Sequence, residues 1–204
     1  MRSLSVPDAP WRRVLLHVIR TLGPLQAAVP VGGSCGLLLQ GVELAKQPND
    51  IDMYYDLTDG ARLHRLLAPW RLEAPHTSVT ERYRSVLSRY RIEEITIETV
   101  GGFTVFAGGS TYRVEIRDWA LKYGPAAELD GTPVRLMPLA HELVFNLLRE
   151  RTDRLEAIST AMRVDLSGHL PALRELMRRN PLSAGHVRTL EHWLGAGLSA
   201  DEEG

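Results

Sequence analysis

The sequence predicts an α+β fold, in which a mixed sheet with flanking helices is followed by an all-helical C-terminal domain. A short apolar run ends in a glycine turn near residue 32, and alternating runs at 50–55 and 92–100 are typical of strands. We expect the region 92–117 to extend the sheet with antiparallel strands. After Pro138 a helical period dominates to the end of the chain. We therefore expect an α/β domain over residues 1–137 and a helical domain over residues 138–204.

Composition restricts the class of protein. With 204 residues, 44% hydrophobic and 24% charged, the chain can bury a core and is ordinary for a soluble protein. The net charge of -1 gives no global attraction to nucleic acid, although the excess of arginine over lysine leaves a local basic surface open. One cysteine permits no internal disulfide and suits a cytoplasmic protein. We expect no signal peptide and no membrane partner. The sequence does not indicate which oligomeric state the protein adopts.

The first third of the chain is expected to alternate helices and strands. Pro10 suits the first position of an amphipathic helix over residues 10–22, and Gly23 can end that helix. Thr58 can cap a later helix that stops near Pro69. The elements expected between them are a strand over 27–31, a helix over 34–44 and a strand over 50–55.

The middle of the chain shows two kinds of pattern. Residues 71–91 are rich in arginine and weakly patterned, which indicates loops and short elements or a mobile flap. Residues 92–100 alternate, and Gly101-Gly102 offers a two-residue hairpin turn into a strand at 103–106. The last strands expected are 112–116 and 134–137.

The C-terminal part is expected to be helical throughout. Thr152 and Ser183 are suitable caps, and Pro171 suits the first turn of a helix. The helices expected are 139–150, 153–163, 171–179 and 184–194.

The turn Gly32-Gly33-Ser34 is a candidate phosphate-binding site. Glycine permits positive φ and lets the backbone approach an anion closely. A helix that begins at Ser34 would point free N–H groups at the anion, and its dipole would favour negative charge there. The same residues also make ordinary strand-to-helix turns, so the turn alone does not identify a phosphate site.

Asp50 and Asp52 are a candidate metal-binding pair. They are two residues apart in an alternating run, so their carboxylates project from one face of a strand. Two carboxylates this close repel each other unless a cation lies between them. Mg²⁺ prefers a few carboxylates together with phosphate oxygens and water. The alternative is a solvated strand end with two exposed acids.

Together these residues resemble a known signature. Val31-Gly32-Gly33-Ser34, a helix-length spacer and Asp50-Ile51-Asp52-Met53 resemble the motif of the DNA polymerase beta-like nucleotidyltransferase superfamily. The helical half resembles the second domain of its small bacterial members, which include antibiotic-modifying and toxin-type enzymes. The resemblance implies a nucleotidyltransferase-type sheet, one or two Mg²⁺ ions on Asp50 and Asp52, and an NTP whose phosphates contact the Gly32-Gly33-Ser34 turn.

The resemblance also implies a third carboxylate on a neighbouring strand, which would complete the metal site and help to activate an acceptor hydroxyl. Glu94, Glu98 and Glu115 are the candidates. Glu98 is favoured because it lies in an apolar context, whereas Glu94 is expected to face outward. Glu115 is second, because arginines on its strand face can neutralise it. We therefore expect Asp50, Asp52 and Glu98 to be catalytic metal ligands.

The function that follows is Mg²⁺-dependent transfer of an NMP from an NTP to the hydroxyl of a small molecule, an RNA end or a protein, in a cleft between the two domains. The alternative is a catalytically silent binding or interaction protein that keeps the fold. That alternative gains weight from Asn146, which lies where the toxin-type members suggest a lysine. A third possibility, a hydrolase with Cys35 as nucleophile, competes with a small buried residue behind the turn.

Overall fold

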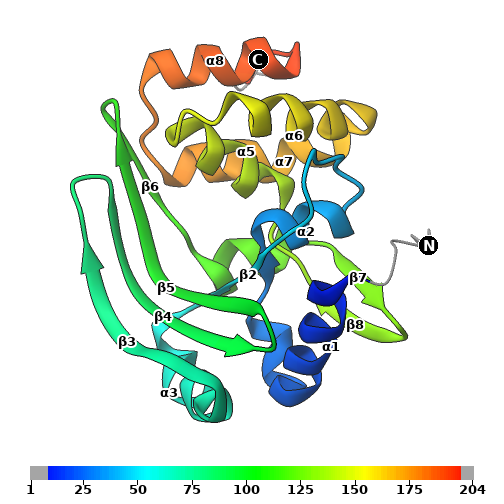
Figure 1. Cartoon of the computed structure of the whole chain (residues 1–204). Coiled ribbons are helices and arrows are strands. Elements are labelled where there is room, and N and C mark those ends of the chain that lie inside the picture. The colour runs from blue at the N-terminus through cyan, green and yellow to red at the C-terminus, as the bar shows by residue number, and fades with distance from the viewer. Residues whose placement is uncertain (1–8, 199–204) are drawn as a thin grey trace.

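The computed structural model describes residues 9–198 and has the α+β architecture that the sequence predicts (Figure 1). The strands are β1 Val31–Gly32, β2 Asp50–Tyr55, β3 Arg71–Val79, β4 Tyr83–Ile92, β5 Ile95–Ala107, β6 Ser110–Arg113, β7 Ala126–Leu129 and β8 Thr132–Arg135. The α-helices are α1 Pro10–Leu22, α2 Gly33–Leu39, α3 Leu57–Leu66, α4 Leu121–Tyr123, α5 Leu139–Leu148, α6 Thr152–Val164, α7 Leu166–Arg179 and α8 Ala184–Leu194. Three short helical turns complete the fold: η1 Gly23–Ala28, η2 Ala68–Trp70 and η3 Ile116–Ala120.

The main sheet is mixed. Five of its six strands follow the order β1-β2-β5-β4-β3, and the sixth, β6, pairs with β5 outside that order. The β2 and β5 strands are parallel, whereas the other neighbours are antiparallel. Strands β7 and β8 form a separate hairpin. The parallel pair at the centre therefore aligns two strands that lie far apart in the sequence.

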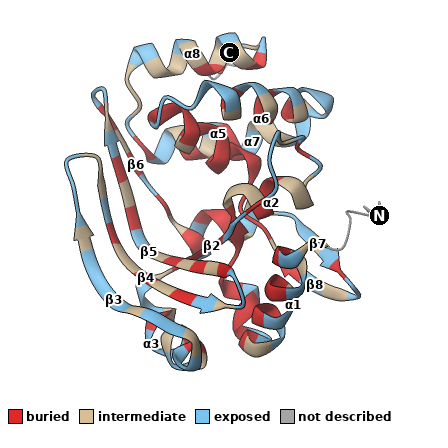
Figure 2. Ribbon diagram, viewed as in Figure 1, coloured by how far each residue is buried: buried red, intermediate tan, exposed pale blue. Residues whose placement is uncertain are grey.

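Helices cover the sheet on both faces and meet it through two hydrophobic clusters (Figures 1 and 2). Helix α1 packs with Ile51, Met53 and Tyr55 of β2 in one cluster. Helices α5 to α8 join Tyr54 of β2 and Phe103 of β5 in the other. The alternation of β2 therefore sends successive side chains to different cores, as a period of two requires. The division into domains at residue 137 stays a prediction.

The prediction for residues 71–106 was wrong in two respects. The stretch predicted as loop or flap forms the long strands β3 and β4, whose hairpin partner is one continuous strand β5. Glu93, at φ 52°, lies in the turn between β4 and β5, whereas Gly101-Gly102 lies inside β5. Gly102 has φ 57°, and the β4–β5 register shifts beside it. This local irregularity has the properties of a β-bulge, so the glycine pair bends the strand and does not reverse it.

Several element boundaries also differ from the predictions. The predicted strand 27–31 was wrong over most of its length: Ala27 and Ala28 belong to η1, and the pairing with β2 begins at Val31. Helix α2 ends at Leu39, short of residue 44. Helix α7 begins at Leu166, so Pro171 lies inside it, and neither Thr58 nor Thr152 is a cap. Pro10 at the start of α1, Gly23 at its C-cap and Ser183 at the N-cap of α8 are confirmed.

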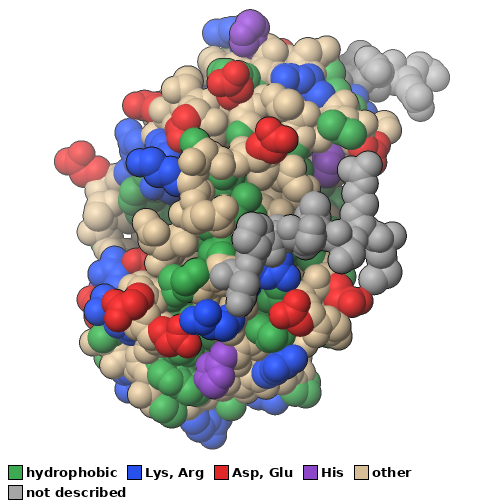
Figure 3. Space-filling model, turned by 45° about the vertical axis from the view of Figure 1, so that its right-hand side comes forward, with side chains coloured by type: hydrophobic (Ala, Val, Ile, Leu, Met, Phe, Trp, Pro, Cys, Tyr) green, Lys and Arg blue, Asp and Glu red, His purple; other side chains and the backbone are tan. Residues whose placement is uncertain are grey.

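The described surface has a mixed charge. On the face in Figure 3, acidic and basic side chains are interspersed, in keeping with the net charge of -1. Among residues 9–198, no helix is both long enough and apolar enough to cross a bilayer.

Candidate active site

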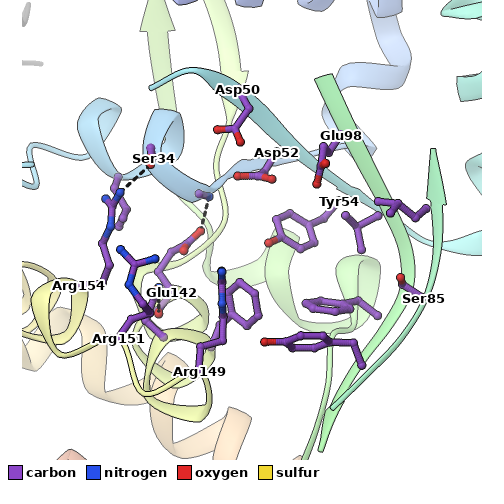
Figure 4. A pocket seen from close by; sticks show the side chains of 18 of the residues that line it. Ser34, Asp50, Asp52, Tyr54, Ser85, Glu98, Glu142, Arg149, Arg151 and Arg154 are labelled. Carbon is purple, nitrogen blue, oxygen red and sulfur yellow. Dashed lines mark hydrogen bonds between the residues drawn. The ribbon is translucent and has the colours of Figure 1, made fainter. Parts of the chain in front are cut away.

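A cleft of about 410 Å³ lies between the main sheet and helices α5 and α6 (Figure 4). Both halves of the chain line it, as expected for a site between them. Its lining includes four acids, Asp50, Asp52, Glu98 and Glu142, and three arginines, Arg149, Arg151 and Arg154. The cleft therefore gathers charged groups of both signs in one place.

The parallel pairing of β2 and β5 brings the predicted acids together. Asp52 lies opposite Glu98 in the register, and Asp50 begins the same strand face. The other two candidates for the third acid lie elsewhere: Glu115 forms an ion pair with Arg179 at 3.1 Å, outside the cleft lining, and Glu94 lies in the β4–β5 turn. Of the three candidates, Glu98 has the position that the resemblance requires.

The glycine turn fits closely against the aspartate strand. Gly33 has φ 57°, and a Cβ atom there would lie 1.9 Å from Oδ2 of Asp52. A Cβ atom on Gly32 would lie 2.7 Å from Cε2 of Tyr54. Both positions therefore require glycine, because the strand leaves no room for a side chain.

Glu142 is a site residue whose role the sequence did not reveal. It is 1% exposed on α5, and its Oε1 accepts a hydrogen bond of 2.7 Å from the Gly33 N–H. The side-chain amide of Asn146 donates to the Glu142 carbonyl oxygen at 2.8 Å. An acid within a largely apolar helix was the available sign, but its partner is 109 residues away in the sequence. A lysine expected by analogy at residue 146 is thus replaced by a neutral amide within the helix.

Crowded acids and burial perturb the titration of the site. Burial, followed by the charges of Asp50, Glu142 and Glu98, raises the pKa of Asp52 to about 7. Burial also raises the pKa of Glu142 to about 7, although the Gly33 N–H opposes the shift. The pKa of Asp50 is raised as well, first by burial and then by Glu98. The site therefore holds carboxylates that oppose one another's ionisation, and a bound cation would relieve this repulsion.

The donor set matches Mg²⁺ in chemistry, because carboxylates of Asp50, Asp52 and Glu98 face one cleft. The carboxylates are not gathered into a coordination shell: residues 9–198 contain no group of three or more His, Cys, Asp and Glu side chains arranged to hold a metal ion. Two acids have other partners. Oε1 of Glu98 accepts from Arg89 at 2.7 Å, and Glu142 accepts from Gly33. Metal binding in this cleft would require Glu98 to reorient.

Arg154 links the helical half to the glycine turn. Its Nη2 donates to Oγ of Ser34 at 3.0 Å, while its Nη1 is buried without a hydrogen-bond partner among the described residues. A buried guanidinium N–H that lacks an acceptor costs free energy unless a ligand supplies one. Arg154 therefore offers an anion a donor directly beside the predicted phosphate turn.

Cys35 does not have the environment of a nucleophile. Its side chain is fully buried, and Sγ donates to the Asp50 carbonyl oxygen at 3.3 Å. Burial, together with the charges of Asp52 and Asp50, raises the pKa of the thiol. The residue therefore packs behind the turn as a neutral thiol, which argues against the cysteine hydrolase.

Comparisons with known proteins address the fold. No protein-family model and no curated protein sequence matches the chain. A structure from Thermotoga maritima, described as a candidate nucleotidyltransferase, aligns at a TM-score of 0.61 and 20% identity, over 80% of this chain and 99% of that one. The antibiotic-resistance factor ANT(2'')-Ia aligns at 0.49 and 14% identity, over 89% and 97% of the two chains. The lincosamide adenylyltransferase LnuA aligns at 0.47 and 10% identity, over 75% and 98%. The chain thus has the nucleotidyltransferase fold that its Gly-Gly-Ser and Asp-x-Asp residues predict.

Proposed function

We propose that this protein is a Mg²⁺-dependent nucleotidyltransferase that moves an NMP from an NTP to an acceptor hydroxyl. The observation that carries the proposal is the register of Asp52 with Glu98, directly beside a glycine turn that contacts the same aspartate. Burial and the charges of neighbouring acids, Glu98 among them, raise the pKa of Asp52, and the turn leaves no room for a side chain, so both features suit a site that receives a ligand. We place the reaction in the cytoplasm, in keeping with a single reduced cysteine.

Each residue has a role in this proposal. The acceptor oxygen forms a bond to the α-phosphorus, the bond to pyrophosphate breaks, and Glu98 takes the hydroxyl proton. The Gly33-Ser34 turn and Arg154 hold the departing phosphates. Asp50, Asp52 and Glu98 would hold Mg²⁺, which supplies charge neutralisation at the phosphates when bound. Most of the catalysis then comes from positioning, with no protein nucleophile.

The silent binding protein remains the second candidate function. Its support is that Glu98 is paired with Arg89 and that Glu142 occupies the Gly33 N–H. A protein that had lost catalysis would keep these internal contacts even in the presence of a nucleotide.

Thermal melting with Mg²⁺ and each NTP separates the two candidates. We expect Mg²⁺ and one NTP together to stabilise the wild-type protein, because a ligand that binds only the folded state raises its stability. The shift should be lost in Asp50→Asn and kept in Asp130→Asn, whose carboxylate lies in the β7–β8 turn beside Arg12, outside the cleft lining. Transfer of label from an α-labelled NTP to pooled metabolites and RNA should likewise be lost in Asp50→Asn and kept in the control variant.

The outcomes are distinct. A shift that survives Asp50→Asn contradicts the metal assignment. A shift that requires Asp50 without any label transfer favours the silent protein, and no shift with any nucleotide contradicts nucleotide binding altogether.

A further inference from the structure

We infer that the acceptor is an uncharged, ring-bearing alcohol, bound in the half of the cleft formed by β3, β4, β5 and Phe145. The inference rests on the proposed function and names its substrate class. It depends on three properties of this half: which side chains line it, how its aromatic rings are arranged, and where it lies relative to the leaving phosphates.

The lining of this half contains hydroxyl and apolar groups but no acid. The residues are Ser78, Thr80, Tyr83, Ser85, Leu87, Val100, Phe103 and Phe145. The acids that line the cleft are on β2, at Glu98 of β5 and at Glu142 of α5. The two halves of the cleft therefore differ in charge, and we call this one the uncharged subsite.

Phe103 reaches the uncharged subsite because of the irregularity at Gly102. Glu98 and Val100 line the cleft at alternate positions of β5, and strict alternation would continue at residue 102. The register shift beside Gly102 moves the cleft-facing position to Phe103. Gly101-Gly102, predicted as a turn, thus forms a bulge, and this bulge places Phe103 in the wall of the subsite.

The rings of the subsite form a connected set. Phe103 lies 5.3 Å from Phe145 edge to face, and 6.0 Å from Tyr83, measured between ring centroids. Such surfaces favour flat or apolar rings, while the nearby hydroxyls of Ser85 and Thr80 can accept or donate hydrogen bonds. The guanidinium of Arg149 lies 4.8 Å from the Phe145 ring centroid. A polycationic acceptor would meet this positive charge. Of the cleft acids, Glu98 borders the subsite, but it already accepts from Arg89 at 2.7 Å and, in the proposed function, serves Mg²⁺ and the acceptor hydroxyl. Further amines would therefore be desolvated without compensation.

The subsite lies on the side from which an acceptor must approach. Nucleophile and leaving group occupy opposite sides of a phosphorus atom in a direct displacement. Figure 4 shows Ser34, Arg151 and Arg154 on one side of Asp50 and Asp52, with Glu98, Tyr54 and Ser85 on the other. If pyrophosphate departs toward Ser34 and Arg154, the acceptor enters from the side of the uncharged subsite, next to Glu98.

Matched glycosides test the inference. The probes are 4-nitrophenyl β-glucoside, its 2-amino-2-deoxy analogue and tobramycin, titrated calorimetrically into the wild-type protein with Mg²⁺ and a non-hydrolysable ATP analogue. We expect the uncharged glucoside to bind at least about tenfold more tightly than the amino analogue, with tobramycin the weakest. Thr80→Asp should reverse the order of the first two, and it keeps an acceptor for the Tyr83 N–H that Thr80 now binds at 2.9 Å. Thr77→Asp adds the same charge to exposed β3 outside the cleft lining and should change nothing.

The result that overturns the inference is distinguishable from failure of the proposed function. Preference for an amine in the wild-type protein, no binding of the uncharged glucoside, or an unchanged order in Thr80→Asp each contradicts the subsite. Tyr83→Leu provides a second check: if it weakens the ATP analogue and spares the glucoside, the rings hold the nucleobase and the inference is wrong. Failure of the proposed function would appear instead as loss of the Asp50-dependent stabilisation by Mg²⁺ and NTP.

Discussion

Strands β2, β4 and β5 carry polar side chains on both faces, and the two sets are held in opposite ways. On the cleft face, burial and the charges of neighbouring acids, Glu98 among them, raise the pKa of Asp52 to about 7. On the opposite face, neutral groups form a closed hydrogen-bond network. Its contacts are His64 Nδ1 to Tyr90 Oη at 2.6 Å, His64 Nε2 to Tyr55 Oη at 3.0 Å, Ser88 Oγ to Thr99 Oγ1 at 2.7 Å and Ser88 Oγ to Tyr90 Oη at 3.0 Å.

Residues that are adjacent in the sequence of β5 belong to different faces, one in the cleft and one in the neutral network. Glu98 and Thr99 are consecutive, yet one faces the acids of the cleft and the other is fully buried with a partner. Burial lowers the pKa of His64, which keeps the network neutral. A satisfied network stabilises the sheet, whereas crowded acids that raise the pKa of the buried Asp52 oppose folding and are explained by a ligand.

The largest expected effect is from Asp52→Asn on the cleft face. We expect label transfer to fall by at least about 10²-fold, a typical loss when an electrostatic group leaves an active site. The free energy of unfolding without Mg²⁺ should rise, because a neutral amide removes the repulsion that raises the pKa of Asp52. Transfer assays and urea melts on the same samples check both. Loss of folding together with loss of activity would show that Asp52 is needed for stability.

Glu98→Gln and Glu115→Gln form the next test. The first removes the acid beside Asp52 and should reduce transfer strongly, with little loss of stability. The second removes one of the two acids that pair with Arg179, while Glu175 stays paired at 2.7 Å, and should leave transfer unchanged. Initial rates at saturating NTP distinguish them, and a reversed order would transfer the third-acid role to Glu115.

Thr99→Val tests the neutral face. We expect a loss of about 1–3 kcal/mol in the free energy of unfolding, because Ser88 loses a buried partner, with transfer unchanged. Ser88→Ala should cost a similar amount, and the double variant less than the sum, since the two hydroxyls share one hydrogen bond. Additive losses would show that the hydrogen bond contributes little.

The last prediction concerns the pH dependence of stability. The folded pKa of Asp52 is about 7, against an ordinary 3.8, so between these values the folded state holds a proton that the unfolded chain has released. Its contribution therefore makes stability fall as pH rises from about 4 to about 7, and level off above. Urea melts at pH 5 and pH 8 should show this fall in the wild-type protein and a smaller one in Asp52→Asn. Stabilisation by Mg²⁺ should be larger at pH 8, and equal effects at both values would contradict a carboxylate site.

Part of the site could be predicted from sequence because it depends on local rules. The alternation of β2 fixed the common face of Asp50 and Asp52, and the apolar context of Glu98 singled it out. The β3–β4 hairpin escaped prediction because β3 is an exposed edge strand, which has no buried face to impose alternation. Gly101-Gly102 has the composition of a turn, yet long-range pairing of β4 with β5 made it a bulge.

The glycine turn, the aspartate pair and the helical second half follow from the sequence, because each depends on spacing within a few residues. Tertiary packing brings Glu98 into register with Asp52, the Gly33 N–H to Glu142 and Arg154 to Ser34. These contacts join residues 46, 109 and 120 positions apart. Such pairings are set by how the sheet and helices pack together, and no local periodicity encodes them.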